Sequence, residues 1–496
     1  MPATHLPSAE DVLNGADFDI NLLSLRNPDF FVSGQIHENL VNWQAILGEN
    51  DQSDEILKWL TNGVDVMEFF KHFKGNFKGR AYVSGAPPKQ YFPNSFSCAE
   101  HVDFICSELC ERIATGSIKL LGKVGTCKPP RIIMPLIVEP TKPRLCHDER
   151  FLNLWIKEIP FQLETLKDIP RNVGKNALMV TCDEKLGYDH VKLSENSHTY
   201  FGIQFGGYFM TYKTLPFGWK ASPFIYQSIG MSVTSYLRSL GMLNTLYIDD
   251  RFAVTKGSNS NDHDLALRSL EIEGYRLSYS LLELLPRLGY TLSLKKCSLV
   301  PSSCKKLLGF LVDSVKQTFV LPDDKKLKFA ELRESMLARD ELDLKTLQRF
   351  CGKCISMGLA VPGCKLFCSE INVAISRAMR NSRSVELSQD LSEELKHWRF
   401  LDDWSGCSKW RPEFHKCIEL STDASGYKYG AVVEYGKEKL ELSDYWTKGD
   451  FRPIHVKEAD ATLKSSLSLG DTLLDSWVDL NTDNLAVSGS WNGQKS

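Results

Sequence analysis

Three aspartates stand where extended apolar segments end. ALMVTCD is a run typical of a buried strand, and it ends at Asp183. Asp249 and Asp250 are adjacent at the tip of LYIDDRFAV, which predicts a hairpin. Hard carboxylate oxygens are the ligands that Mg²⁺ prefers, and a pair of such ions promotes phosphoryl transfer. If the two segments meet on one face of a sheet, the three carboxylates can share a pair of Mg²⁺ ions.

The Asp249–Asp250 pair has a simpler interpretation. Two adjacent like charges in an apolar hairpin are costly when partly desolvated, unless a cation neutralises them. A solvated turn would avoid that cost without any metal, and for the pair alone this alternative carries about equal weight. The remaining motifs decide between the two.

Residues 129–313 resemble the fingers and palm of retroelement reverse transcriptases. The resemblance is carried by an ordered set of motifs: RLCHDERFLN, VTCDEKLGYDHVKL, LPFGWKASPFIYQ, YIDD, LSLKKCSLVP and LLGFLVD. It implies an RNA- and DNA-directed DNA polymerase that adds dNTPs to a primer on an RNA or DNA template. Asp183, Asp249 and Asp250 would then be catalytic ligands of two Mg²⁺ ions, for which Mn²⁺ could substitute. The alternative is a catalytically inactive nucleic-acid-binding relic, although clustered carboxylates would repel phosphates in the absence of metal.

The resemblance also implies contacts to the incoming nucleotide. Tyr188 matches the steric gate that excludes a ribose 2′-hydroxyl, with a core aromatic as its alternative. Lys142 and Arg144 match triphosphate contacts of the fingers, with a solvated charged face as their alternative. The family often has a lysine before the fingers turn, where this chain has Val138 and Glu139, so one phosphate contact is in doubt.

Three further substrate contacts are expected from the later motifs. Phe217 and Gly218 match the loop that lies against nucleotide and template, and Gly218 would permit a close backbone approach. Phenylalanine at 217, where retroviral enzymes have glutamine, favours a retrotransposon. Lys295 or Lys296 could protonate the pyrophosphate; we expect Lys295, but the sequence does not separate the two, and a surface lysine is an equal alternative.

A second acidic set follows. Asp423 ends a strand in STDASG, Glu458 lies in an expected helix, and Asp483 follows another strand. The set resembles ribonuclease H, which implies two more Mg²⁺ ions and an RNA–DNA hybrid substrate. The chain stops at Ser496, so we expect an incomplete module with weak or absent cleavage. HDERFLNLW and this segment look most like DIRS-type, tyrosine-recombinase retrotransposons.

The expected fold is α+β: a right-hand polymerase followed by a partial ribonuclease H-like α/β domain. Residues 1–95 form an N-terminal extension of unknown function, in which 78–94 are rich in Gly, Pro and aromatics and suit a linker. Fingers and palm span 96–318, a mainly helical thumb and connection 319–405, and the ribonuclease H-like domain 412–496. Oligomeric state stays open.

Composition sets broad limits. The net charge of −3 over 496 residues does not by itself indicate a nucleic-acid binder, although a local basic groove is compatible with it. No secretory signal or membrane span is expected, and 14 scattered cysteines favour reduced thiols in the cytoplasm or nucleus. Cys351, Cys354, Cys364 and Cys368 have zinc-like spacing, but their apolar surroundings favour buried free thiols.

Overall fold

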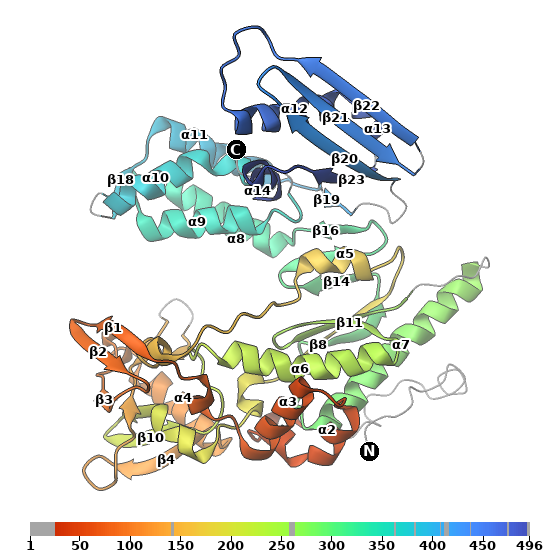
Figure 1. Cartoon of the computed structure of the whole chain (residues 1–496). Helices are drawn as coiled ribbons and strands as arrows, with labels where there is room; N and C mark the ends of the chain where they lie inside the picture. Colours follow the sequence, from red (N-terminus) through yellow and green to blue (C-terminus); the bar gives the residue numbers. More distant parts are fainter. Residues whose placement is uncertain are drawn as a thin grey trace. The chain divides into compact units, whose positions relative to one another are not determined.

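The computed structural model describes residues 25–139, 143–256, 263–361, 364–380, 383–406, 408–410, 416–436, 438–473 and 476–493. The chain divides into two compact units, Met1–Pro322 and Asp323–Ser496 (Figure 1). Each unit has mixed helix and strand content, as expected for the fold class, and each is described by itself.

The palm of the first unit is a four-stranded antiparallel sheet in the order β11-β12-β8-β13. Its strands are β8 (Met179–Asp183), β11 (Leu243–Tyr247), β12 (Asp250–Val254) and β13 (Ser298–Ser302). Helix α6 (Ser222–Ser239) packs on β11, and α7 (His263–Leu288) packs on β8 and β13 (Figure 1). Gly289 ends α7 with a φ of 100°, a left-handed conformation that glycine adopts without a Cβ penalty. The expected strand ending at Asp183 and the expected YIDD hairpin are both confirmed.

The fingers contain a five-stranded sheet in the order β3-β5-β9-β10-β4. Its strands are β3 (Gln90–Tyr91), β4 (Ile118–Lys123), β5 (Ile132–Ile133), β9 (Gly202–Phe205) and β10 (Tyr208–Tyr212). Gly206 and Gly207 join β9 to β10 with positive φ, so the predicted hairpin is confirmed. Helix α4 (Val102–Ala114) precedes β4, and the short strands β6 (Leu136–Val138) and β7 (Leu145–His147) carry the fingers motif. A separate meander, β14 (Cys304–Leu307), β15 (Phe310–Asp313) and β16 (Thr318–Val320), follows the palm.

The described part of the N-terminal region is not a separate extension. Helices α2 (Leu40–Ile46) and α3 (Asp51–Asn62) pack on α7 and α6, and Trp43 and Trp59 belong to the same hydrophobic core as the palm. The Trp43 indole N–H donates to the carbonyl of Leu288 at 3.0 Å. The predicted linker over 78–94 was also wrong, because β1 (Phe73–Phe77) and β2 (Arg80–Ser84) form a hairpin, and β3 joins the fingers sheet. In residues 78–94 a glycine allows a tight turn, and aromatic residues pack against the core.

The second unit begins with a helical region, as predicted for the thumb and connection. Its elements are α8 (Asp323–Leu337), β17 (Glu341–Asp343), α9 (Leu344–Ser356), α10 (Ser369–Arg380), β18 (Ser384–Glu386) and α11 (Gln389–His397). The predicted apolar face of LSEELKHWRFL is fully buried, at Leu391, Leu395, Trp398 and Leu401. The four zinc-spaced cysteines, Cys351, Cys354, Cys364 and Cys368, are buried and form no disulfide.

The second unit ends in a four-stranded sheet with the order β22-β21-β20-β23. A short strand, β19 (Ser408–Lys409), precedes β20 (Lys416–Ala424), β21 (Lys428–Tyr435) and β22 (Glu438–Tyr445), and β23 (Ser476–Asn481) pairs parallel to β20. Helix α12 (Ile454–Ser468) packs on β20 and β21, with α13 (Gly470–Leu473) and α14 (Leu485–Gly493) around it (Figure 1). The three successive strands predicted from the sequence are confirmed.

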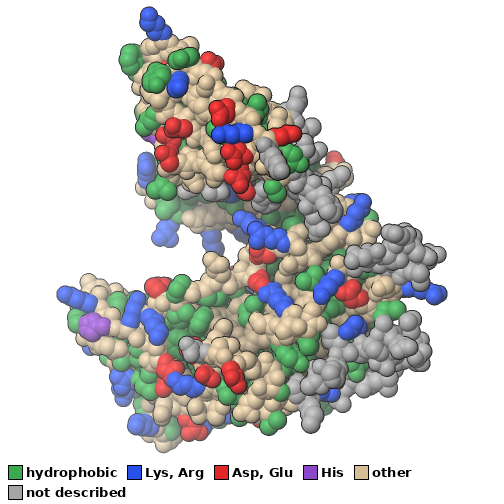
Figure 2. Space-filling view, turned by 45° about the vertical axis from the view of Figure 1, so that its right-hand side comes forward, with side chains coloured by type: hydrophobic (Ala, Val, Ile, Leu, Met, Phe, Trp, Pro, Cys, Tyr) green, Lys and Arg blue, Asp and Glu red, His purple; other side chains and the backbone are tan. Residues whose placement is uncertain are grey.

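The surface carries mixed charge. Basic and acidic side chains are interspersed on the face shown in Figure 2. Within the part of the chain that the structure describes, every helix is too short or too polar to cross a membrane.

Candidate active sites

The first site is built where β8 and β12 run side by side. Asp183, the last residue of β8, is the direct antiparallel partner of Asp250, the first residue of β12. Directly paired residues point to the same face of a sheet, with Cβ atoms about 4.5–5.5 Å apart. The sequence requirement that the two segments meet on one face is therefore met.

Asp249 is held in the turn between β11 and β12. Its carbonyl accepts the Glu184 N–H at 3.1 Å, which ties the turn to the residue after Asp183. Ile248, the other turn residue, has a φ of 58°, a strained conformation for a β-branched residue. The Ile248 N–H donates to Oε1 of the buried Gln227 at 2.8 Å, and the Gln227 amide donates to Leu246 at 3.1 Å. Gln227, the last residue of the LPFGWKASPFIYQ motif, thus holds the strained turn in place.

Burial and neighbouring charges perturb the carboxyl groups of Asp249 and Asp250. Burial raises the pKa of Asp250 to about 6, and the charges of Asp249 and Asp183 add to that rise. Burial and then Asp183 likewise raise the pKa of Asp249. Lys296 opposes both shifts, and its Nζ lies 3.3 Å from Oδ1 of Asp183. Partly buried acids that resist ionisation together are a donor set that a divalent cation would satisfy.

A buried ion pair lies one residue further along each strand. Nε of Arg251 is 2.6 Å from Oε1 of Glu184, and the Tyr226 hydroxyl donates to the other carboxylate oxygen. Arg251 also lies 5.7 Å from the centre of the Tyr290 ring. The sequence motifs did not indicate this pair. Its signal was present as two opposite charges, each directly after a predicted metal ligand in an otherwise apolar strand.

Aromatic side chains line the approach to the aspartates. The Tyr188 ring lies 4.8 Å from the Phe217 ring and 5.6 Å from the Tyr226 ring. Burial raises the pKa of Tyr188 to about 12, and the charges of Asp249 and Tyr247 add to the rise. Phe217 is 54% exposed, so its face is available for contact.

The structure changes the expected role of Gly218. Its φ is 97°, and a Cβ there would meet the His147 carbonyl oxygen at 2.5 Å. The close backbone approach is therefore made to β7 of the fingers. Asn153 reinforces it by donating to the Gly218 carbonyl at 2.8 Å.

The remaining predicted nucleotide contacts differ in their positions relative to the aspartates. Arg144 is exposed at the start of β7, with its carbonyl bonded to the Glu139 N–H. Lys142 lies outside the described residues. Of the two candidate lysines, Lys296 is the one that contacts Asp183; Lys295 is exposed beside it. Both lysines lie in a turn, and the sequence alone did not resolve the directions of their side chains.

The second site gathers its acids more tightly. Carboxylate oxygens of Asp423, Glu458 and Asp483 all lie within 4.8 Å of one another, the one acidic group of this kind among the described residues. Asp423 comes from β20, Glu458 from α12, and Asp483 from the turn after β23. Oε2 of Glu458 is buried without a hydrogen-bond partner. Burial, and then the charge of Asp483, raise the pKa of Glu458. These three residues fit a hard divalent cation.

Comparisons with known proteins agree with this architecture. The reverse transcriptase (RNA-dependent DNA polymerase) family matches residues 128–312. No curated protein matches the sequence. Among solved structures, a foamy viral protease-reverse transcriptase in complex with RNA/DNA hybrid is 17% identical, with a TM-score of 0.56 over 96% of this chain and 61% of that chain. The same foamy viral protein in complex with dsDNA is 15% identical, with a TM-score of 0.52 over 96% of this chain and 93% of that one.

These likenesses show the fold, and the chain spans about three fifths (61%) of the first of those relatives. The DIRS-type assignment stays a prediction, as does a cytoplasmic or nuclear location. The match over residues 128–312 contains the paired aspartates, the YIDD turn and the loop at Phe217. The chain therefore contains a reverse transcriptase domain.

Proposed function

We propose that this chain is an RNA- and DNA-directed DNA polymerase of a retrotransposon, which adds dNTPs to a primer annealed to an RNA or DNA template. The single observation that carries the proposal is the direct pairing of Asp183 with Asp250, with Asp249 in the adjoining turn. Carboxylates that crowd together at the ends of two neighbouring strands destabilise the fold, but they can bind the metal ions that promote phosphoryl transfer.

Each residue has a role in this proposal. Asp183, Asp249 and Asp250 would hold two Mg²⁺ ions, which lower the pKa of the primer 3′-hydroxyl and stabilise the charge on the transferring phosphate. Tyr188, braced by Phe217, would fill the space that a ribose 2′-hydroxyl needs. Lys296 carries its ammonium group beside Asp183, where it can meet the phosphates of an incoming nucleotide.

Primer extension tests the proposal. The full chain should extend a primed RNA and a primed DNA template in Mg²⁺, and Asp250→Asn should lower the rate by at least about a hundredfold, because a metal ligand is lost. Asp54→Asn, an exposed aspartate of α3, is the matched control and should extend at the wild-type rate. Tight template binding without any incorporation by the wild type would favour the nucleic-acid-binding relic.

A specific observation favours a second activity. The Asp423, Glu458 and Asp483 cluster, with its buried unpartnered Oε2 atom, supports cleavage of the RNA strand of an RNA–DNA hybrid with two further divalent ions. Cleavage of a labelled hybrid should require Mg²⁺ or Mn²⁺ and disappear in Asp423→Asn, while primer extension is retained. Cleavage that persists in Asp423→Asn would show that another nuclease is responsible.

A further inference from the structure

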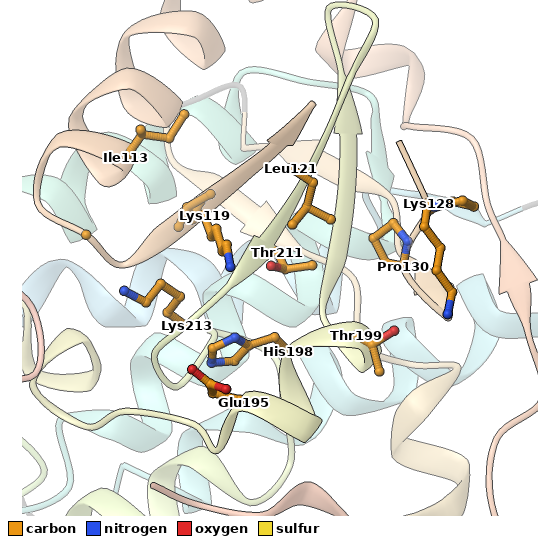
Figure 3. Close-up of a pocket in the computed structure, with 13 residues that line it drawn as sticks. Ile113, Lys119, Leu121, Lys128, Pro130, Glu195, His198, Thr199, Thr211 and Lys213 are labelled. Carbon is orange, nitrogen blue, oxygen red and sulfur yellow. The ribbon is translucent and has the colours of Figure 1, made fainter. Parts of the chain in front are cut away.

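A pocket of about 630 Å³ opens on the fingers, lined by residues of α4, β4, β10, the loop at 128–130 and the 3-10 helix η9 (Glu195–Tyr200) (Figure 3). Its volume falls within the range of small-ligand sites, roughly 300–1,000 Å³. None of its lining residues belongs to the two acidic sites described above.

The sheet itself supplies the floor of the pocket. Thr211 of β10 is the direct partner of Lys119 of β4, so their side chains share a face. The alternate residues, Met210 and Tyr212, point into the core. The pleat therefore places Lys119 and the Thr211 hydroxyl on the side of the sheet away from the core, and Lys213, just beyond the end of β10, also lines the pocket.

Positive charge dominates the pocket. Its lining includes Lys119, Lys128 and Lys213 against one acid, Glu195. His198 lies among them (Figure 3), and burial lowers its pKa, with the charges of Lys213 and Lys119 lowering it further. The apolar side chains of Leu121 and Pro130 complete the walls.

One polar group in the pocket has no partner. Thr211 is 3% exposed, and its Oγ1 atom is buried without a hydrogen bond. Buried hydroxyls without a hydrogen bond are costly and therefore uncommon. In Figure 3 this oxygen lies on the Lys119 side of the pocket floor. A phosphate oxygen accepts hydrogen bonds from a hydroxyl and from ammonium groups, which are the donors that Thr211, Lys119 and Lys213 bring to the pocket.

We propose that this pocket binds a backbone phosphate of a nucleic-acid strand, with Lys119, Lys213 and the Thr211 hydroxyl as its donors and Leu121 and Pro130 against the adjoining sugar or base. The site goes beyond the proposed function, because binding here needs neither the catalytic aspartates nor a metal. Free phosphate shares the same chemistry, and the experiment separates the two sources.

Lysine footprinting tests the site directly. The full chain is labelled with an amine-reactive acetylating reagent in EDTA, alone or with single-stranded (dT)10, a (dT)10 with neutral methylphosphonate linkages, or inorganic pyrophosphate, and each lysine is quantified by mass spectrometry. With (dT)10, labelling of Lys119 and Lys213 should fall at least threefold. Lys123, exposed on the same strand outside the pocket, is the matched control and should be unchanged. The neutral oligomer should give no protection.

Two variants add an independent readout. Thr211→Val removes the unpartnered hydroxyl, so it should raise the melting temperature without ligand and weaken (dT)10 binding. Lys213→Gln should lower the slope of log K against log salt by about 1, as expected for one lost phosphate contact, whereas Lys123→Gln should not. Equal labelling of Lys119 and Lys213 with and without (dT)10 would overturn the proposal. Protection by pyrophosphate alone would overturn its assignment to a strand.

Discussion

The buried Glu184–Arg251 pair is the strongest test of how the palm is held together. Side chains of both residues are almost inaccessible, at 0% and 2% exposed, and the Nε–Oε1 distance is 2.6 Å. Each follows a proposed metal ligand on adjacent strands, with the Tyr226 hydroxyl on the carboxylate and the Tyr290 ring against the guanidinium. Loss of one partner therefore leaves a charge in a dry environment.

The magnitude follows from that burial. In Glu184→Gln the amide keeps the shape and an acceptor oxygen but removes the negative charge. Arg251 is then left with neutral partners: the amide, the Tyr290 ring, the Gly230 carbonyl at 3.4 Å and Thr234 Oγ1 at 3.3 Å. Breaking a buried ion pair in this way costs about 3–5 kcal/mol of unfolding free energy. Replacing both partners with methionine removes both desolvation costs, and the double variant should fall within about 2 kcal/mol of the wild type.

The assay combines stability with activity. Urea unfolding of each single variant and of the double variant gives the coupling free energy, and primer extension reports on the aspartates. We expect extension by the double variant to fall about tenfold while it stays folded, because a small misplacement of Asp183 or Asp250 is costly for the reaction. Glu68→Gln is the control, since Glu68 pairs with Lys58 at 2.5 Å on the surface, where such pairs are worth less than about 1 kcal/mol. A cost for Glu184→Gln no larger than that of the control would refute the reasoning.

Three further predictions follow from single positions. Gly218→Ala should destabilise the fold by about 1–3 kcal/mol in urea unfolding and lower extension, because a left-handed φ and a 2.5 Å contact with His147 both oppose a Cβ. The His190 ring donates a hydrogen bond to the Gly187 carbonyl and accepts one from the Thr291 N–H, and burial lowers its pKa to about 4. Its contribution to the free energy of unfolding is therefore complete above the unfolded-state pKa of roughly 6.5 and is lost as the pH falls toward 4. Wild type should therefore lose about 2 kcal/mol more than His190→Gln between pH 7 and pH 5 in the same assay. Asp250→Asn should raise the metal-free stability by about 1 kcal/mol after allowance for solvent screening, since it relieves like-charge repulsion, and should reduce the stabilisation that Mg²⁺ gives.

Sequence patterns predicted the elements best where a local rule sets the geometry. Strand β8 and the β11–β12 hairpin follow from apolar runs that end at charged residues, and Gly289 ends α7 where a left-handed residue is needed. The region before residue 96 was misread because it carries no chemical motif. Trp43 and Trp59 nevertheless complete the palm core, which is a long-range fact that local pattern does not contain.

The site residues also differ in how far local sequence patterns could predict their positions. The motif order predicted that Asp183 and Asp250 belong together, and the strand register accounts for it. The choice between Lys295 and Lys296 depends on the direction in which each side chain leaves the turn, and composition carries no information on that. Gly218 was expected to permit a close backbone approach, but the atom that requires its glycine is the carbonyl oxygen of His147, which the sequence could not indicate.

The alternation of side chains along a strand is a rule that would have predicted more of the site residues. Once Asp183 and Asp250 are placed at the reacting edge, the adjoining Glu184 and Arg251 must leave that face, and two opposite charges directed into an apolar layer are stable only as a pair. The same rule applied to β10 separates Thr211 from the core residues Met210 and Tyr212. In both places the strand register decides which polar side chains meet, and the chemistry of the meeting pair then follows from charge and burial.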